Sequence, residues 1–236
     1  MISVVANWKM NLSITEAREY LELFFTQHPP LDKIDLLIAP PFTVLPFLST
    51  FIKQQSFKIT AQNVHWESKG AFTGEISPAM LKDVSCSHVI VGHSERRQYF
   101  SESNELVASK ARAVLQADMI PIVCIGEDLQ AYKEARTQEV LSSQLSLVKE
   151  LNPIWIAYEP VWSIGSGQIP SSQEISQAIS TIKAEMPQSL VLYGGSVNSN
   201  NLPELIRVNL LDGFLVGGLS IKPLDFSAFL HQLAST

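Results

Sequence analysis

The chain has 236 residues, of which 46% are hydrophobic and 17% are charged, and its formal net charge is -6. This composition is typical of a globular protein and excludes a disordered chain. No basic cluster stands out beyond Arg96 and Arg97 and no apolar run approaches the ~18 residues of a membrane span, so neither a nucleic-acid surface nor a transmembrane segment is expected.

The two cysteines, Cys86 and Cys124, do not suggest a disulfide framework. The apolar stretch at the N-terminus is too short for the core of a signal peptide, and no basic segment precedes it. We therefore expect a protein that works in the reducing cytoplasm.

Short apolar runs rich in β-branched residues predict strands at eight places along the chain. These places are 2–6, 34–39, 57–62, 88–92, 119–125, 154–159, 190–193 and 213–217. Each interval has room for a crossover helix, which needs about a dozen residues.

Helical patterns are expected at 13–27, 102–117, 130–150 and 171–186. Ser13 and Glu16 have the spacing of a capping box, and Pro187 follows the last of these segments.

The predicted strands are continuous apolar runs, which is typical of strands that are buried on both faces of a parallel sheet. Eight such strands alternating with helices predict a single (β/α)8 barrel that spans residues 1–236 as one domain. A doubly wound open sheet is the structural alternative.

In such a barrel the active site lies at the C-terminal ends of the strands. The first predicted strand leads into Asn7 and Lys9, the fourth into His93, and the sixth ends at Glu159. Taken singly, a lysine here is commonly a solvated surface residue and a histidine a structural one. A carboxylate directly after the apolar run 154–158 is costly and harder to dismiss. Because these residues all follow strands at the same rim of the barrel, together they predict a catalytic site.

Glycine-rich turns follow the seventh and eighth predicted strands, at 194–196 and 217–218. Backbone N–H groups approach an anion closely where no Cβ intrudes, and this part of a barrel is a frequent phosphate site. A third glycine-bearing loop, 160–167, carries Val161, Trp162 and Ile164. Apolar residues in a surface loop favour a lid that buries them on closing, with a static Ω-loop as the alternative.

Eight sequence strings in register resemble the triosephosphate isomerase family, and together they run from residue 7 to residue 218. In chain order they occupy 7–11, 61–63, 70–75, 92–97, 124–127, 157–162, 193–197 and 213–218. The resemblance implies the TIM barrel of that family and an aldose–ketose isomerase that interconverts dihydroxyacetone phosphate and D-glyceraldehyde 3-phosphate, in glycolysis and gluconeogenesis.

The resemblance also implies catalytic roles. Glu159 would be the general base that removes a carbon-bound proton, and His93 would polarise the substrate carbonyl. Lys9 would stabilise the enediolate and help to bind substrate, and Asn7 would orient both. Glu95 would support Lys9.

For the phosphate, the resemblance implies backbone N–H groups of Gly165, Ser196, Gly217 and Gly218. Tyr193 and Ser196 would hydrogen-bond the closed lid. No metal or organic cofactor is expected, and the sequence offers no clustered Cys/His ligand set.

The loop 70–75 implies a homodimer by the same resemblance, because in the family it inserts into the neighbouring subunit. Thr73 would then lie near Asn7 and Lys9 of the partner. Without the resemblance, this segment would be only a flexible hairpin-like loop.

The lid departs from the family pattern at Ser163, Ser166, Gln168 and Pro170. We expect these changes to alter the kinetics of the lid, Pro170 by stiffening its C-terminal hinge, without loss of the chemistry.

Two other functions are considered. An aldolase-like phosphate-binding lyase would need a lysine buried within a strand, and only Lys58, near a strand start, comes close. A non-catalytic binding or scaffold barrel would not require Asn7, Lys9, His93 and Glu159 together.

Overall fold

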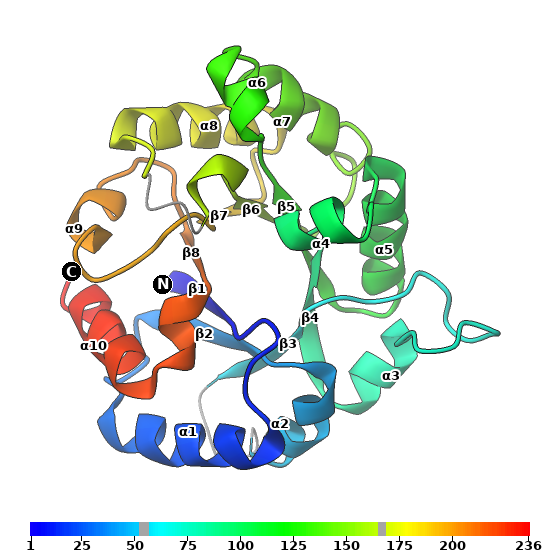
Figure 1. Cartoon of the computed structure of the whole chain (residues 1–236), viewed down its shortest axis with the longest axis vertical. Helices are drawn as coiled ribbons and strands as arrows, with labels where there is room; N and C mark the ends of the chain where they lie inside the picture. Colours follow the sequence, from blue (N-terminus) through cyan, green and yellow to red (C-terminus); the bar gives the residue numbers. More distant parts are fainter. Residues whose placement is uncertain (52–56, 165–168) are drawn as a thin grey trace.

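The computed structural model describes residues 1–51, 57–164 and 169–236. Strands β1 to β8 form a closed parallel barrel in chain order (Figure 1). Their bounds are β1 (Ile2–Asn7), β2 (Ile34–Ala39), β3 (Lys58–Ala61), β4 (Cys86–Val91), β5 (Ile120–Ile125), β6 (Trp155–Tyr158), β7 (Leu190–Tyr193) and β8 (Gly213–Val216). Because β8 pairs with β1, with Ser3 opposite Gly213, the (β/α)8 barrel is confirmed and the open-sheet alternative is wrong.

Helices surround the barrel on its outside (Figure 1). Among the described residues they are α1 (Ile14–Gln27), α2 (Leu45–Phe51), α3 (Pro78–Asp83), α4 (Ser94–Tyr99), α5 (Asn104–Gln116), α6 (Leu129–Lys133), α7 (Thr137–Leu145), α8 (Ser172–Glu185), α9 (Leu202–Leu205) and α10 (Pro223–Ala234). Short 3-10 turns are η1 (Phe42–Val44), η3 (Val161–Ser163) and η4 (Gly218–Ile221). The predicted capping box at Ser13 and Glu16 is present at the start of α1.

The strands bury apolar side chains on both faces, which explains their continuous apolar sequences. Alternate residues such as Val5, Ile90 and Ala157 form a cluster made up of strand residues alone, which fills the inside of the barrel. Their neighbours along each strand, such as Val4 and Val89, join a second cluster with the inner faces of the helices. The barrel is therefore a packed core, and a ligand can bind only at its ends.

The sequence pattern predicted one helix over 130–150, but the structure has two. Helix α6 ends at Lys133 and α7 begins at Thr137, and between them Ala135 has a left-handed φ of 55°. A left-handed residue cannot continue an α-helix, so the chain turns here and starts again. After this break, α7 packs against α8 and β5.

Among the described residues, no helix combines the length and the apolar character needed to cross a membrane.

Candidate active site

A cavity of about 290 Å³ lies at the C-terminal ends of the strands. Its lining includes most of the residues predicted for the site, namely Asn7, Lys9, His93, Glu159, Ser196, Gly217 and Gly218. These residues come from strands or turns at opposite sides of the barrel, so closure of the barrel is what brings them together.

A larger groove, of about 690 Å³, lies outside the barrel among α6, α7 and α8. Its described lining carries the carboxylates Glu127 and Glu174 and no lysine or arginine. An anionic substrate is therefore better matched by the smaller cavity, where Lys9 supplies a positive charge.

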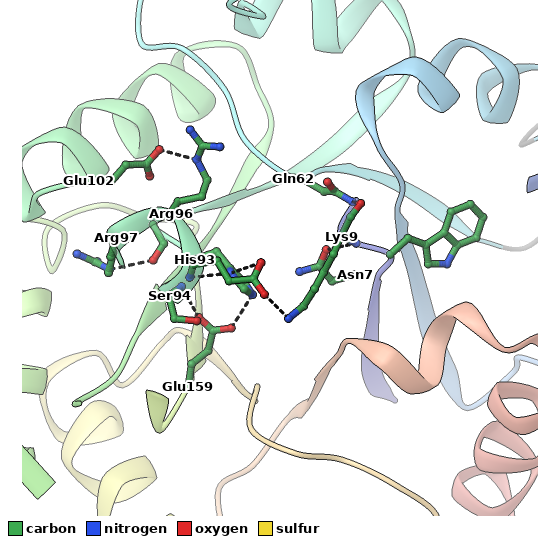
Figure 2. Close-up of polar contacts among 12 residues, drawn as sticks. Asn7, Lys9, Gln62, His93, Ser94, Arg96, Arg97, Glu102 and Glu159 are labelled. Carbon is green, nitrogen blue, oxygen red and sulfur yellow. Dashed lines mark hydrogen bonds and ion pairs between the residues drawn. The ribbon is translucent and has the colours of Figure 1, made fainter. Parts of the chain in front are cut away.

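Glu159 and His93 form a buried pair in the wall of the cavity (Figure 2). The His93 Nε2 atom lies 3.0 Å from Glu159 Oε1, and the backbone N–H of Ser94 donates to Glu159 Oε2 over 3.0 Å. Glu159 is only 2% exposed. A buried carboxylate is stable only when it is paired in this way.

The proton on the imidazole can be placed from its contacts. His93 caps the N-terminus of α4, and its Nδ1 accepts a hydrogen bond from the backbone N–H of Glu95 over 3.2 Å. An accepting Nδ1 carries no proton, so the neutral ring holds its proton on Nε2, which faces Glu159. The imidazole is thus oriented as a donor toward Glu159, and both side chains line the cavity.

The two groups shift each other's pKa. Burial alone would raise the pKa of the Glu159 carboxyl, but the nearby His93, the Ser94 N–H and Lys9 outweigh burial and lower it. Burial likewise lowers the pKa of His93, and the charge and hydrogen bond of Glu159 outweigh that effect and raise it. The pair therefore favours the ionised form of Glu159.

Lys9 follows β1 in an unusual backbone conformation, with a left-handed φ of 51°. Its N–H donates to Asn7 Oδ1 over 3.1 Å, and its C=O accepts from Gln62 Nε2 over 2.9 Å. Gln62 also donates to the C=O of Ala39, at the end of β2. These bonds direct the side chain of Lys9 across the mouth of the barrel (Figure 2). Its Nζ lies 2.6 Å from Glu95 Oε1.

The glycine-rich turns form the opposite side of the cavity. Gly218 begins η4, and a Cβ at Gly217 would lie 3.3 Å from Lys9 Cε. Ser196 donates from Oγ to the C=O of Ser163, over 3.0 Å, so the turn after β7 is tied to the segment after β6. Backbone groups of these turns and the ammonium of Lys9 thus border the same space.

Tyr193 and Thr73 are absent from the described lining of this cavity. Gly165 falls outside the described residues, as do Ser166 and Gln168 of the expected lid. Tyr193 is buried at the end of β7 beside Gly195, and its hydroxyl has no hydrogen-bond partner among the described residues. Thr73 is exposed in the segment between β3 and α3, which extends away from the barrel (Figure 1).

Sequence reasoning gave no role to Ser94 or Gln62, which hold Glu159 and Lys9 through backbone hydrogen bonds. Both lie within the sequence strings given above and shortly after the end of a strand. Their position at a strand end was the signal that could have identified them. Among the described residues, no group of three or more His, Cys, Asp and Glu side chains is arranged to hold a metal ion.

Lys58, the lysine considered for a Schiff base, is exposed at the start of β3 and pairs with Asp35 over 2.8 Å. It lies at the opposite end of its strand from the cavity, so no aldolase-like centre forms around it.

Comparison with known proteins agrees with this geometry. The family model described as triosephosphate isomerase matches residues 2–233. A curated triosephosphate isomerase of Dictyoglomus thermophilum is 40% identical over 238 residues, covering 94% of this chain and 96% of the relative. One of Dehalococcoides mccartyi is 40% identical over 245 residues (99% and 96%), and one of Prochlorococcus marinus is 39% identical over 233 residues (95% and 95%). The chain therefore belongs to the triosephosphate isomerase family.

Proposed function

We propose that this chain interconverts dihydroxyacetone phosphate and D-glyceraldehyde 3-phosphate, the aldose–ketose isomerisation of its family, within glycolysis and gluconeogenesis. The observation that supports it best is the meeting of Glu159, His93 and Lys9 in one cavity bordered by glycine-rich turns. A base, a neutral donor and a cation are what a proton transfer next to a carbonyl requires.

In the proposed reaction, the Glu159 carboxylate takes a proton from the hydroxyl-bearing carbon beside the carbonyl. The electrons of the broken C–H bond form a carbon–carbon double bond, and the carbonyl electrons move onto oxygen, giving an enediolate. The proton of the hydroxyl group then moves to the former carbonyl oxygen through His93, and Glu159 returns its proton to the neighbouring carbon as the new carbonyl forms. No proton, electron or atom is lost overall. The hydrogen bond from the Ser94 N–H to the Glu159 carboxylate lowers the pKa of this base.

His93 and Lys9 would stabilise the charge that develops on oxygen. The Nε2–H of neutral His93 lies against Glu159 at the wall of the cavity. There it would donate to the carbonyl oxygen of a bound substrate, then give and recover its proton between the two oxygens. Lys9 adds a full positive charge, and Asn7 holds the backbone of Lys9 in place. Such preorganised donors are commonly the largest contribution to catalysis.

The phosphate would bind on the side formed by Ser196, Gly217 and Gly218, with Gly165 completing the set as the family resemblance implies. Support comes from their position in the cavity lining and from the lack of side chains at the two glycines. Tyr193 and Ser196 would steady the closed lid over the bound substrate.

We further propose that the chain acts as a homodimer in the cytoplasm, with residues 1–236 forming one catalytic domain. The loop 70–75 supports the dimer, because it extends from the barrel and exposes Phe72, at 42%, next to Thr73. Met10 is 95% exposed after β1, and Phe100 is 63% exposed after α4. Large apolar side chains exposed near a catalytic rim favour a protein–protein contact.

A coupled assay on the purified protein tests the reaction. Glyceraldehyde 3-phosphate is supplied, and dihydroxyacetone phosphate is followed through its NADH-dependent reductase, for the wild type, Glu159→Gln and the exposed control Glu150→Gln. We expect rapid turnover by the wild type and the control, and a loss of roughly three orders of magnitude or more in Glu159→Gln. A folded wild type without turnover, or a Glu159→Gln variant that is fully active, would contradict the proposal.

A further inference from the structure

The side chain of Gln144 binds both backbone polar groups of Gly126, the residue that follows β5. The N–H of Gly126 donates to Gln144 Oε1 over 2.8 Å, and Gln144 Nε2 donates to the Gly126 C=O over 3.1 Å. Gly126 is buried, while Gln144 reaches it from the partly buried face of α7. Buried backbone groups that lose their partners are costly, so this side chain fixes the position of Gly126.

Gly126 in turn packs directly against the backbone of Glu159. A Cβ built on Gly126 would lie 1.7 Å from the C=O oxygen of Glu159, so only glycine fits at this position. The Glu159 N–H donates to the C=O of Ile125, the neighbour of Gly126, over 2.7 Å. The end of β5 therefore sets where the backbone of Glu159 lies.

The other side of Glu159 is equally restricted. A Cβ at Gly194, after β7, would lie 2.9 Å from Glu159 Cγ, and the Gly194 N–H donates to the C=O of Tyr158 over 2.8 Å. Glu159 is thus held between the ends of β5 and β7, and any movement of Gly126 is passed to it. Gln144 itself is absent from the described lining of the cavity and contacts none of the groups assigned to substrate binding.

We propose that Gln144 is a positioning residue for the base Glu159, acting through the backbone of Gly126. This inference rests on the proposed function, because it assigns Glu159 the role of base. Misplacing a reacting group by about 1 Å can cost as much as 100-fold in rate, while phosphate and carbonyl contacts are left in place. Loss of the Gln144 hydrogen bonds should therefore lower kcat and leave KM nearly unchanged.

The test compares Gln144→Met, which keeps the length and loses both hydrogen bonds, with Gln138→Met as a matched control. Gln138 is exposed near the start of the same helix. We expect Gln144→Met to lower kcat about 10-fold or more with KM within about two-fold of the wild type, and Gln138→Met to leave both within about two-fold. Circular dichroism confirms that each variant is folded.

Gln144→Glu provides a second readout that a purely structural role would not give. Its carboxylate accepts from the Gly126 N–H but cannot donate to the Gly126 C=O, whereas the protonated acid does both. The ratio of its kcat to that of the wild type should therefore rise as pH falls from about 8 to about 5, toward the pKa of a glutamate. This variant decides the matter if Gln144→Met does not fold.

The inference is overturned if folded Gln144→Met keeps kcat within about two-fold of the wild type, or if the Gln144→Glu ratio is independent of pH. A fall in kcat/KM that comes from KM alone also overturns it. If the wild type itself does not turn over, the proposed function fails instead, so the two failures are distinguishable.

Discussion

The Lys9 ammonium and the Glu95 carboxylate form an ion pair of 2.6 Å at the mouth of the cavity, where the two side chains are 29% and 41% exposed. Ion pairs with this much solvent contact contribute little stability, at most about 1 kcal/mol. Under the proposed function, an anionic substrate would therefore replace Glu95 as the partner of Lys9 without a large cost.

Replacing the two members of this pair should therefore have unequal effects. Lys9→Met removes the cation that we propose stabilises the enediolate, and we expect kcat/KM to fall about 100-fold or more. Glu95→Gln keeps a hydrogen-bond acceptor for Lys9 and should lose much less. Steady-state kinetics of both variants, with the exposed Lys149→Met as control, measure this order, and a larger loss in Glu95→Gln than in Lys9→Met would contradict it.

His93→Gln should move the acid limb of the kcat/KM profile to higher pH. Burial raises the pKa of Glu159, and His93 makes the largest contribution that lowers it again. As the pH falls, His93 takes up a proton and its charge helps to keep Glu159 ionised. Glutamine keeps an N–H donor but cannot take up a proton, so the pKa of Glu159 rises in the variant. Because the proposed base acts as a carboxylate, activity is expected above that pKa and lost below it.

The measurement is kcat/KM against pH for the wild type, His93→Gln and the exposed control His231→Gln. The quantity compared is the pH at which the acid limb falls, not the maximum kcat/KM, since His93→Gln also lowers the rate itself. An acid limb that stays in place, or moves to lower pH, would show that His93 does not hold Glu159 ionised.

The site residues next to strand ends could be predicted from the sequence, because the apolar run that predicts a strand also shows which residue follows its C-terminal end. Asn7, His93 and Glu159 were found in this way, and the closed barrel then places them in one cavity. Lys9 was found too, although its left-handed backbone and its support by Gln62 have no sequence signature.

Gln144 shows why the rest could not be predicted. Its partner Gly126 is 18 residues away, and the contact depends on the break between α6 and α7, which the apolar pattern of 130–150 did not reveal. Its contact with Gly126 depends only on the distance between the side chain and that backbone in the folded chain, and no sequence periodicity predicts this distance.

Thr73→Arg tests the proposed dimer. An arginine at the tip of the loop 70–75 places a charged side chain in the expected contact with the partner, where it would be desolvated without a counter-charge. We expect a monomer by sedimentation velocity and a fall in kcat/KM, because the loop would no longer lie beside the partner's Lys9. The control Thr26→Arg, on the exposed face of α1, should leave the oligomeric state unchanged. A wild type that sediments as a monomer would refute the dimer directly.

His88 should make the stability of the fold dependent on pH, far from the catalytic rim. It lies buried at the start of β4, with its Nδ1 2.8 Å from Ser87 Oγ and its ring 4.6 Å from the Trp155 ring. Its Nε2 has no hydrogen-bond partner among the described residues. Burial and the charge of Lys58 lower the pKa of His88 to about 4, and Asp35 opposes this shift.

The direction of the effect follows from proton binding in the two states. Above pH ~6.5, the pKa of an unfolded histidine, His88 is neutral in both states and stability is fully present. As pH falls from there to about 4, the unfolded chain binds a proton that the folded chain excludes, and His88 removes up to about 3 kcal/mol of the free energy of unfolding. His88→Phe keeps a buried ring and removes the proton site, so urea titrations at pH 7 and pH 4.5 should give a smaller difference in the variant than in the wild type. The variant removes only the His88 proton site. If the free energy of unfolding changes equally between the two pH values in both proteins, other groups, such as Glu159 and His93, cause the pH dependence.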